Sequence, residues 1–392
     1  MLKTGTDFKR MSPEHKKRSP GNRRTNPEHN KGRRISRTIG IIMASVLLLF
    51  SVISMIVVVF IYNGQFPRYD RHDMTIAAGL RYEDLQAQYP RDLVRFPSGD
   101  HFLQGYVYDQ DQAQGLVVIA HGIGGGADSY LPQITYFLDQ GWRVFAYDAT
   151  GSFDSEGRTT KGFPQALIDL DAALTYINTS EALSAYPKLL FGHSWGGYAV
   201  ANILHYDYDI AGVVTVSGAN SPMEIVLEQG RSMMGNFIDV QAPFLWLYQR
   251  ILFGEAASLQ AVDAINGTDV PVLIIHGTED ELVAYGGSSI ISKAGQITNP
   301  NVRILAVKEA GQNGHNSLFR SETAISYIDE INVVYRKLYD DHEQNIPYGI
   351  KQAFYSKVDR SLAQDLNRPL MDEIQAFFTN ALRYQVPYQS WQ

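Results

Sequence analysis

Residues 189–201 have the sequence Leu-Leu-Phe-Gly-His-Ser-Trp-Gly-Gly-Tyr-Ala-Val-Ala, and this stretch decides the fold. A short apolar run of the kind found in buried strands leads through a G-x-S-x-G pentapeptide at 192–196 into a helical pattern. The pentapeptide requires this order of strand, turn and helix, because the sharp turn holds the serine hydroxyl clear of the sheet. Side chains do not fit beside so tight a turn, which explains the flanking glycines. Ser194 is therefore a candidate nucleophile at the start of a helix.

Further apolar runs on both sides of this motif predict the other strands of one sheet. They lie at 115–120, 143–148, 188–192, 212–217, 270–276 and 302–307. Helical patterns at 129–140, 164–176 and 196–205 separate them, and a closing helix is predicted at 371–382. Continuous apolar strands that alternate with helices are typical of an α/β fold, with a mainly parallel sheet covered on both faces. Residues 219–268 and 316–370 interrupt this alternation, and insertions of that size often form caps or lids.

A serine hydroxyl is a weak nucleophile and needs a base, which in turn needs an orienting acid. In this arrangement the chain order is serine, then acid, then histidine. Asp280 follows the apolar run 272–275 and is the candidate acid. Glu279 and Glu281 flank it and could take its place.

The candidate base is His315, in a glycine-rich loop after the last predicted strand. The other nine histidines lie in the N-terminal tail, before the sheet, in other motifs, in a helix or too far along the chain. The tetrahedral intermediate of acyl transfer also needs two backbone N–H donors. We assign these to Trp195, directly after the serine, and to Ile123, in the glycine-rich turn 121–126 that follows the first apolar strand.

Taken together, these segments resemble the α/β-hydrolase superfamily, and most of all its serine aminopeptidase and monoacylglycerol-lipase-like branch. The matching motifs are His-Gly-Ile-Gly-Gly at 121–125, Tyr-Asp-Ala-Thr-Gly-Ser-Phe-Asp-Ser-Glu-Gly at 147–157, Gly-His-Ser-Trp-Gly-Gly at 192–197, Pro-Val-Leu-Ile-Ile-His-Gly-Thr-Glu-Asp at 271–280 and Gly-His-Asn at 314–316. The resemblance implies an α/β-hydrolase fold with a serine nucleophile. Relatives usually carry Arg where Ala149 or Thr150 stands here, and the insertion after His315 is larger than the usual spacing.

Three other classes of protein account for fewer of these sequence motifs. Gly122-x-Gly124-x-x-Ala127 together with Asp148 fits a loose dinucleotide-binding pattern, but the hydrolase interpretation uses the same residues and explains the later motifs as well. A hydrolase fold kept only as a binding domain is expected when a triad member is missing, and none is. A metal enzyme is disfavoured, because no H-E-x-x-H motif occurs and the chain has no cysteine. We therefore predict neither a cofactor nor a metal.

The N-terminal part of the chain predicts a membrane anchor. Residues 1–38 hold a net charge of +9 within a chain of net charge −7, and no charged side chain occurs between Arg37 and Arg68. Residues 39–62 are almost wholly apolar, and a helix of this length, roughly 36 Å, spans a bilayer core. A cleaved signal peptide has a shorter apolar core and a small-residue cleavage site. Tyr62 and Phe66 are expected to form an interfacial aromatic belt.

The charge asymmetry also predicts the orientation of the anchor. A basic tail stays in the cytoplasm, so the hydrolase domain, residues 63–392, is expected outside a cell membrane. The tail is rich in Pro, Asn, Arg and Lys, which predicts disorder. We expect it to set topology rather than to bind nucleic acid.

The insertion at 219–268, which we expect to form a cap, indicates the kind of substrate. Its apolar and adaptable side chains would suit an acyl chain, although the same side chains could simply pack the cap onto the body. They are Met223, Met233, Met234, Phe237, Phe244, Trp246, Leu247, Tyr248 and Phe253. We expect a carboxylic ester or acylglycerol first, a short peptide second, and acyl transfer to an acceptor other than water third. An aminopeptidase would need a carboxylate in the cap, for which Glu224 and Glu228 are available.

Overall fold

An eight-stranded, mostly parallel sheet forms the centre of the structure, a computed structural model that describes residues 27–385. The strands are β1 (Arg91–Ser98), β2 (His101–Tyr108), β3 (Leu116–Ala120), β4 (Arg143–Tyr147), β5 (Lys188–His193), β6 (Ile210–Val216), β7 (Val272–Gly277) and β8 (Val302–Val307). Their order in the sheet is β1-β2-β4-β3-β5-β6-β7-β8. β2 pairs antiparallel with β1 and β4, and every other pairing is parallel. The predicted α/β fold is thus confirmed.

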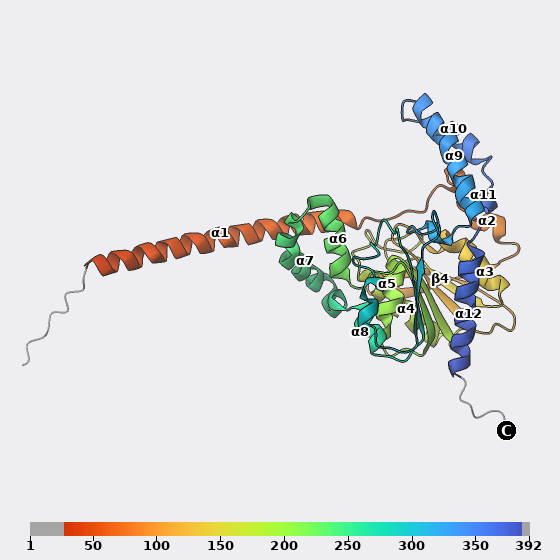
Figure 1. Cartoon of the computed structure of the whole chain (residues 1–392), viewed down its shortest axis with the longest axis horizontal. Coiled ribbons are helices and arrows are strands. Elements are labelled where there is room, and N and C mark those ends of the chain that lie inside the picture. The colour runs from red at the N-terminus through yellow and green to blue at the C-terminus, as the bar shows by residue number, and fades with distance from the viewer. Residues whose placement is uncertain (1–26, 386–392) are drawn as a thin grey trace, which may run out of the picture. The chain divides into compact units, whose positions relative to one another are not determined.

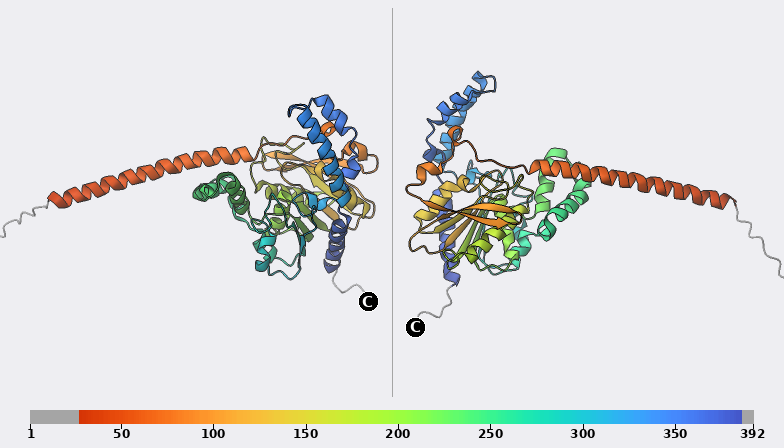
Figure 2. Two further views of the ribbon diagram at one scale, coloured as in Figure 1. Left: turned by 45° about the horizontal axis from the view of Figure 1, so that its top comes forward. Right: turned by 180° about the vertical axis from the view of Figure 1, so that it is seen from behind.

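Helices cover both faces of this sheet (Figures 1 and 2). One face packs against α4 (Gln165–Thr179), α5 (Trp195–Asn202) and α8 (Ala261–Asn266). The other face packs against α3 (Leu131–Asp139) and α12 (Arg368–Gln385). Every residue of β3, β5, β6 and β7 is buried, which explains why these strands are apolar throughout instead of alternating.

The two excursions from the alternating pattern are helical. α6 (Pro222–Met234) and α7 (Phe237–Phe253) lie between β6 and α8, and we call this pair the cap. α9 (Glu322–Asp341), α10 (Tyr348–Tyr355) and the short α11 (Arg360–Ala363) lie between β8 and α12. α9 and α10 project away from the sheet (Figure 1). The remaining short helices are α2 (Tyr82–Leu85) and the 3-10 turns at Met74–Ile76, Ala127–Tyr130, Ile203–His205, Gly254–Ser258, Ile291–Gln296 and Ser317–Phe319.

Helix α1 (Pro27–Gln65) contains the predicted anchor and extends beyond it at both ends. Residues 27–38, predicted to be disordered, are helical, because Pro27 suits a first helical turn and no later proline interrupts the helix. Residues 1–26 of the predicted tail lie outside the described residues. The segment Ser36–Gln65 is long and apolar enough to cross a membrane.

The chain divides into two compact units between Ile53 and Ser54, so the last three turns of α1 belong to the same unit as the sheet. Ser54, Val58 and Tyr62, spaced four residues apart on one side of the helix, are buried there. Phe66 is buried as well, so neither it nor Tyr62 forms the exposed aromatic belt that the sequence predicted. Both belong instead to the cluster of apolar side chains that includes α4, α5 and the cap.

Candidate active site

Ser194 occupies a strained turn between β5 and α5. Its backbone has φ 57° and ψ −114°, a conformation that residues other than glycine rarely adopt. A Cβ atom on Gly192 would lie 2.3 Å from the carbonyl oxygen of Gly196, and one on Gly196 would lie 2.0 Å from the carbonyl oxygen of Ala120. Steric exclusion therefore requires both glycines of the pentapeptide, as predicted from the sharpness of the turn.

Asp280 and His315 meet across the ends of β7 and β8. The Nδ1 atom of His315 lies 2.8 Å from each carboxylate oxygen of Asp280. One of these oxygens also accepts hydrogen bonds from the backbone N–H groups of Leu282, at 3.0 Å, and Val283, at 2.8 Å. Burial favours the neutral acid, but hydrogen bonds from His276 and His315 outweigh it and hold the pKa of Asp280 well below its usual value. The carboxylate is thus an anion that orients the imidazole ring.

The flanking acids have other positions. A carboxylate oxygen of Glu281 accepts a hydrogen bond from the backbone N–H of His315 at 2.9 Å and makes none with its ring. Among residues 27–385, the side chain of Glu279 accepts no hydrogen bond from this ring. Of the three acids that the sequence left open, Asp280 is the one that faces the imidazole.

A second histidine, His276, also contacts this carboxylate, and its position in the sequence predicts no role for it. Its Nε2 atom lies 2.8 Å from the carbonyl oxygen of Val283 and 3.2 Å from Asp280 Oδ2. Because a carbonyl only accepts, Nε2 carries the proton and the N–H points toward both oxygens. His276 precedes the acid by four residues at the end of a buried strand, and that spacing was the only signal in the sequence.

The hydroxyl of Ser194 makes no hydrogen bond with any described residue, His315 included. Ser194 is partly exposed, whereas His315 is buried. Catalytic hydrogen bonds are often long in the free enzyme and shorten only when substrate binds. The structure therefore brings two of the three predicted triad residues into contact and places the serine on the wall of the adjoining pocket.

A chain of hydrogen bonds joins the loops that carry these residues. The backbone N–H of Gly122 donates to the hydroxyl of Tyr130 at 2.9 Å, and this hydroxyl donates to Nδ1 of His193 at 2.7 Å. Nε2 of His193 then donates to the carbonyl oxygen of His315 at 3.0 Å. Burial, together with the nearby His315, lowers the pKa of His193 to about 3, so the ring is neutral as this pattern requires.

The two predicted oxyanion donors both lie close to the serine in the structure. Trp195 opens α5, and the first amides of a helix have no acceptor within it. Ile123 follows Gly122 and lines the same pocket as Ser194. Neither backbone N–H donates to another described residue, so both are free to bind a ligand oxygen.

The turn that carries Ile123 is fixed by the ring of His121. Its Nε2 atom accepts a hydrogen bond from the backbone N–H of Ala149 at 2.9 Å, and Nδ1 donates to the carbonyl oxygen of Gly122 at 2.7 Å. Burial lowers the pKa of His121 to about 4, which keeps the ring neutral.

Asp148, which a dinucleotide-binding protein would turn toward a ribose, is fully buried. Its carboxylate accepts hydrogen bonds from the backbone N–H of Ala127 at 2.7 Å and from the hydroxyl of Tyr106 at 2.8 Å. Burial raises its pKa to about 6. Asp148 therefore holds the start of the 3-10 turn Ala127–Tyr130 in place. Among the described residues, no group of three His, Asp or Glu side chains is arranged to hold a metal ion.

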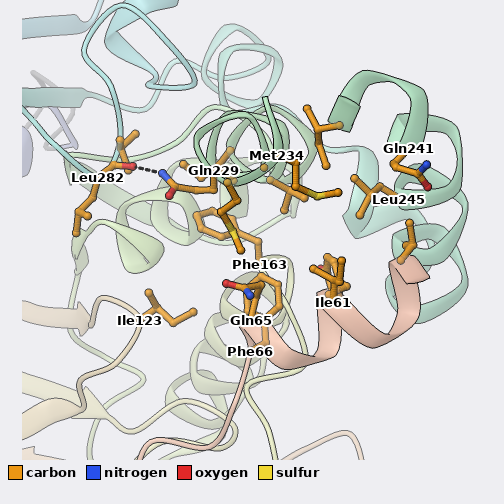
Figure 3. A pocket seen from close by; sticks show the side chains of 18 of the residues that line it. Ile61, Gln65, Phe66, Ile123, Phe163, Gln229, Met234, Gln241, Leu245 and Leu282 are labelled. Carbon is orange, nitrogen blue, oxygen red and sulfur yellow. Dashed lines mark hydrogen bonds between the residues drawn. The ribbon is translucent and has the colours of Figure 1, made fainter. Parts of the chain in front are cut away.

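An apolar pocket of about 300 Å³ opens beside Ser194. Figure 3 shows its walls: Ile61 and Gln65 come from the end of α1, and Met234 and Leu245 come from the cap. The side-chain amide of Gln229 donates to the carbonyl oxygen of Leu282 at 2.7 Å, so this polar group is already paired. The pocket thus offers apolar surface along most of its length.

Known proteins resemble part of this chain. Residues 111–262 match the family model described as "Serine aminopeptidase, S33". A non-heme chloroperoxidase of Streptomyces lividans is 28% identical over 218 residues, covering 44% of this chain and 77% of that protein. An (E)-2-((N-methylformamido)methylene)succinate hydrolase of Acinetobacter baylyi is 22% identical over 206 residues, covering 45% of this chain and 76% of that protein. The structure of an esterase from Pyrococcus furiosus matches this one with a TM-score of 0.48 and 17% sequence identity. The match covers 70% of this chain and 97% of the esterase.

The strand order and the strained serine between β5 and α5 show the α/β-hydrolase fold, and the matched sequence supports the α/β-hydrolase superfamily. The resemblance inferred from the motifs is confirmed at this level. The family match ends before Asp280 and His315, so the assignment of these two residues depends on their geometry.

Proposed function

We propose that the chain is a membrane-anchored serine esterase that cleaves esters of apolar acyl groups through an acyl-enzyme on Ser194. The observation that carries this proposal is the position of Ser194 on the wall of an apolar pocket, beside an oriented and hydrogen-bonded Asp280–His315 pair. A pocket of this size and polarity suits an acyl chain.

The mechanism follows from these groups. Ser194 Oγ attacks the ester carbonyl carbon while Nε2 of His315 takes the hydroxyl proton, and the N–H groups of Ile123 and Trp195 bind the oxyanion. When the intermediate collapses, the bond to the alcohol oxygen breaks and His315 gives its proton to that oxygen. Water then attacks the acyl-enzyme by the same route and releases the acid. Throughout, Asp280 stabilises the imidazolium ion.

An aminopeptidase is the second candidate, because the matching family model carries that description. Such an enzyme needs an unpaired carboxylate for the substrate amine. Glu228 accepts hydrogen bonds from the backbone N–H groups of Ala284 and Ser288, and Glu224 lies 3.3 Å from Nζ of Lys293. Neither carboxylate lines the pocket, so the contacts favour an ester over a peptide.

The location of the enzyme is part of the proposal. The apolar helix would cross the cell membrane once through its part before Ser54, with the basic N-terminus in the cytoplasm and the hydrolase unit outside. Domain limits follow the same division: a cytoplasmic tail, a spanning helix and a hydrolase unit with insertions at 219–268 and 316–370.

Labelling with a fluorophosphonate probe tests the nucleophile. The full chain in detergent is compared with Ser194→Ala and with Ser232→Ala, which changes an exposed serine of α6. We expect labelling of the wild type and of Ser232→Ala only. Equal labelling of folded Ser194→Ala would refute the assignment. A panel of p-nitrophenyl esters and aminoacyl-p-nitroanilides then separates esterase from peptidase, and turnover of the anilides alone would favour the second candidate.

A further inference from the structure

A second pocket, of about 250 Å³, is lined by the turn that carries Ile123. Ile123 lines both this pocket and the apolar pocket beside Ser194, which we call the acyl pocket, so the two meet at a proposed oxyanion donor. Asn316, the residue after His315, lines the second pocket as well. The base delivers its proton to the leaving alcohol, and the second pocket adjoins the loop that carries this base. The acyl pocket and the second pocket are thus positioned for the two halves of one ester.

Arg320 gives this second pocket a positive charge that no carboxylate balances. Among the described residues, Arg320 takes part in no ion pair, and its guanidinium donates to the neutral side-chain amide of Gln364. Burial lowers its pKa, as expected for a cation without a counter-ion. By contrast, Arg71, which lines a neighbouring pocket together with Arg320, pairs with Asp128, and so does Arg91. A partly buried cation without a partner is costly unless a ligand supplies the anion.

Gln133, on α3, adds an unpaired acceptor to the same pocket. Its side chain is 5% exposed, and its carbonyl oxygen Oε1 has no hydrogen-bond partner among the described residues. Leaving a buried acceptor without a partner is unfavourable. A hydroxyl group of a ligand would satisfy it. The pocket therefore combines a donor for an anion with an acceptor for a hydroxyl.

We propose that this second pocket binds the alcohol part of the substrate, and that this part is an anionic, hydroxyl-bearing group held by Arg320 and Gln133. The proposal rests on the proposed esterase function and deepens it, because it specifies the substrate class as acyl esters of anionic alcohols. A phosphate or a carboxylate offers the oxygen pair that a guanidinium binds best. The second pocket takes no part in bond making.

The test compares three esters of one fatty acid with the full chain in neutral detergent. They are a 1-monoacylglycerol, the corresponding monoacylglycerol phosphate, and the 4-O-acyl ester of 3,4-dihydroxybutanoate, each of which keeps a free hydroxyl group. Wild type, Arg320→Gln, Arg320→Lys and the control Arg336→Gln, an exposed arginine of α9, are assayed on each. We expect Arg320→Gln to raise KM for the preferred anionic ester ten- to a hundredfold, with kcat and neutral-ester turnover unchanged. Arg320→Lys should recover part of the loss.

The outcomes separate this inference from the esterase proposal. Preference for the phosphate or for the carboxylate ester identifies the anion. Equal kcat/KM on neutral and anionic esters, or an equal loss on all three in Arg320→Gln, would overturn the inference while leaving the esterase intact. A wild type that hydrolyses no ester and takes up no fluorophosphonate would overturn the esterase proposal itself.

A second measurement needs no variant. Glycerol 3-phosphate should slow fluorophosphonate labelling of the wild type at concentrations where glycerol has no effect. Equal labelling rates with both compounds would count against the anion site.

Discussion

Replacing His193 with glutamine should remove part of the protein's sensitivity to acid. His193 is buried, its pKa is about 3 in the folded chain, and the ordinary value is 6.5. A folded-state pKa below the unfolded value gives stability that is complete above pH 6.5 and is lost as the pH falls toward 3. Each pH unit in that window costs about 1.4 kcal/mol, so the histidine lowers the free energy of unfolding by about 2 kcal/mol at pH 5.

Glutamine can keep both contacts of the ring without gaining a proton. Its amide oxygen can accept from the hydroxyl of Tyr130, and its amide nitrogen can donate to the carbonyl oxygen of His315. His121 also makes the folded protein less stable as the pH falls, because its pKa is lowered in the folded chain. Asp148 has the opposite effect, because its pKa is raised in the folded chain. Both residues are present in wild type and variant, so their contributions cancel in the comparison.

The assay is urea unfolding of the full chain in detergent, followed by tryptophan fluorescence between pH 8 and pH 5. The difference in unfolding free energy between wild type and His193→Gln should shift by about 2 kcal/mol in favour of the variant across this range. His205→Gln, at an exposed histidine, should follow the wild type. Parallel curves for wild type and His193→Gln would refute the proposed neutral ring and its hydrogen-bond chain.

Three further changes test other parts of the site. Asp280→Asn should lower kcat on a p-nitrophenyl ester by about 10⁴-fold with little change in KM, because the amide no longer fixes the imidazole tautomer; a loss below tenfold would contradict its role. Gly196→Ala should lower the free energy of unfolding by more than about 3 kcal/mol, measured by thermal unfolding, because its Cβ would lie 2.0 Å from a backbone oxygen. Gly286→Ala is the control and should leave stability nearly unchanged, because the space around Gly286 is open. Met234→Trp should shift the preferred acyl chain to a shorter length in a C2–C12 ester series, and Leu252→Trp, an exposed control, should not.

Much of the site could be predicted from local sequence because the chemistry imposes local rules. The sharp turn at Ser194 demands glycines at fixed positions, and buried parallel strands demand continuous apolar runs. The same rules placed Asp280 and His315 after their strands, where the structure has them in contact.

The remaining contacts depend on residues far apart in the chain. The bond between Tyr130 and His193 joins residues 63 positions apart, and no local pattern predicts it. Hydropathy likewise predicted an apolar helix but could not distinguish side chains that face lipid from those that face protein. For this reason Val58 and Tyr62 were assigned to the membrane span, whereas the structure buries them in the hydrolase unit.

The end of α1 is at once the last part of the apolar helix and a wall of the acyl pocket. Cutting the chain after residue 62, at the boundary that hydropathy suggests, would remove Val58, Ile61 and Tyr62 from that wall and expose Phe253, which packs beside Tyr62 near Gly162. A water-soluble fragment made in this way would be a different enzyme, with a wider and wetter binding site. Substrate preferences of this protein therefore have to be measured on chains that begin before Ser54, because proteolysis within this part of α1 would alter the acyl pocket.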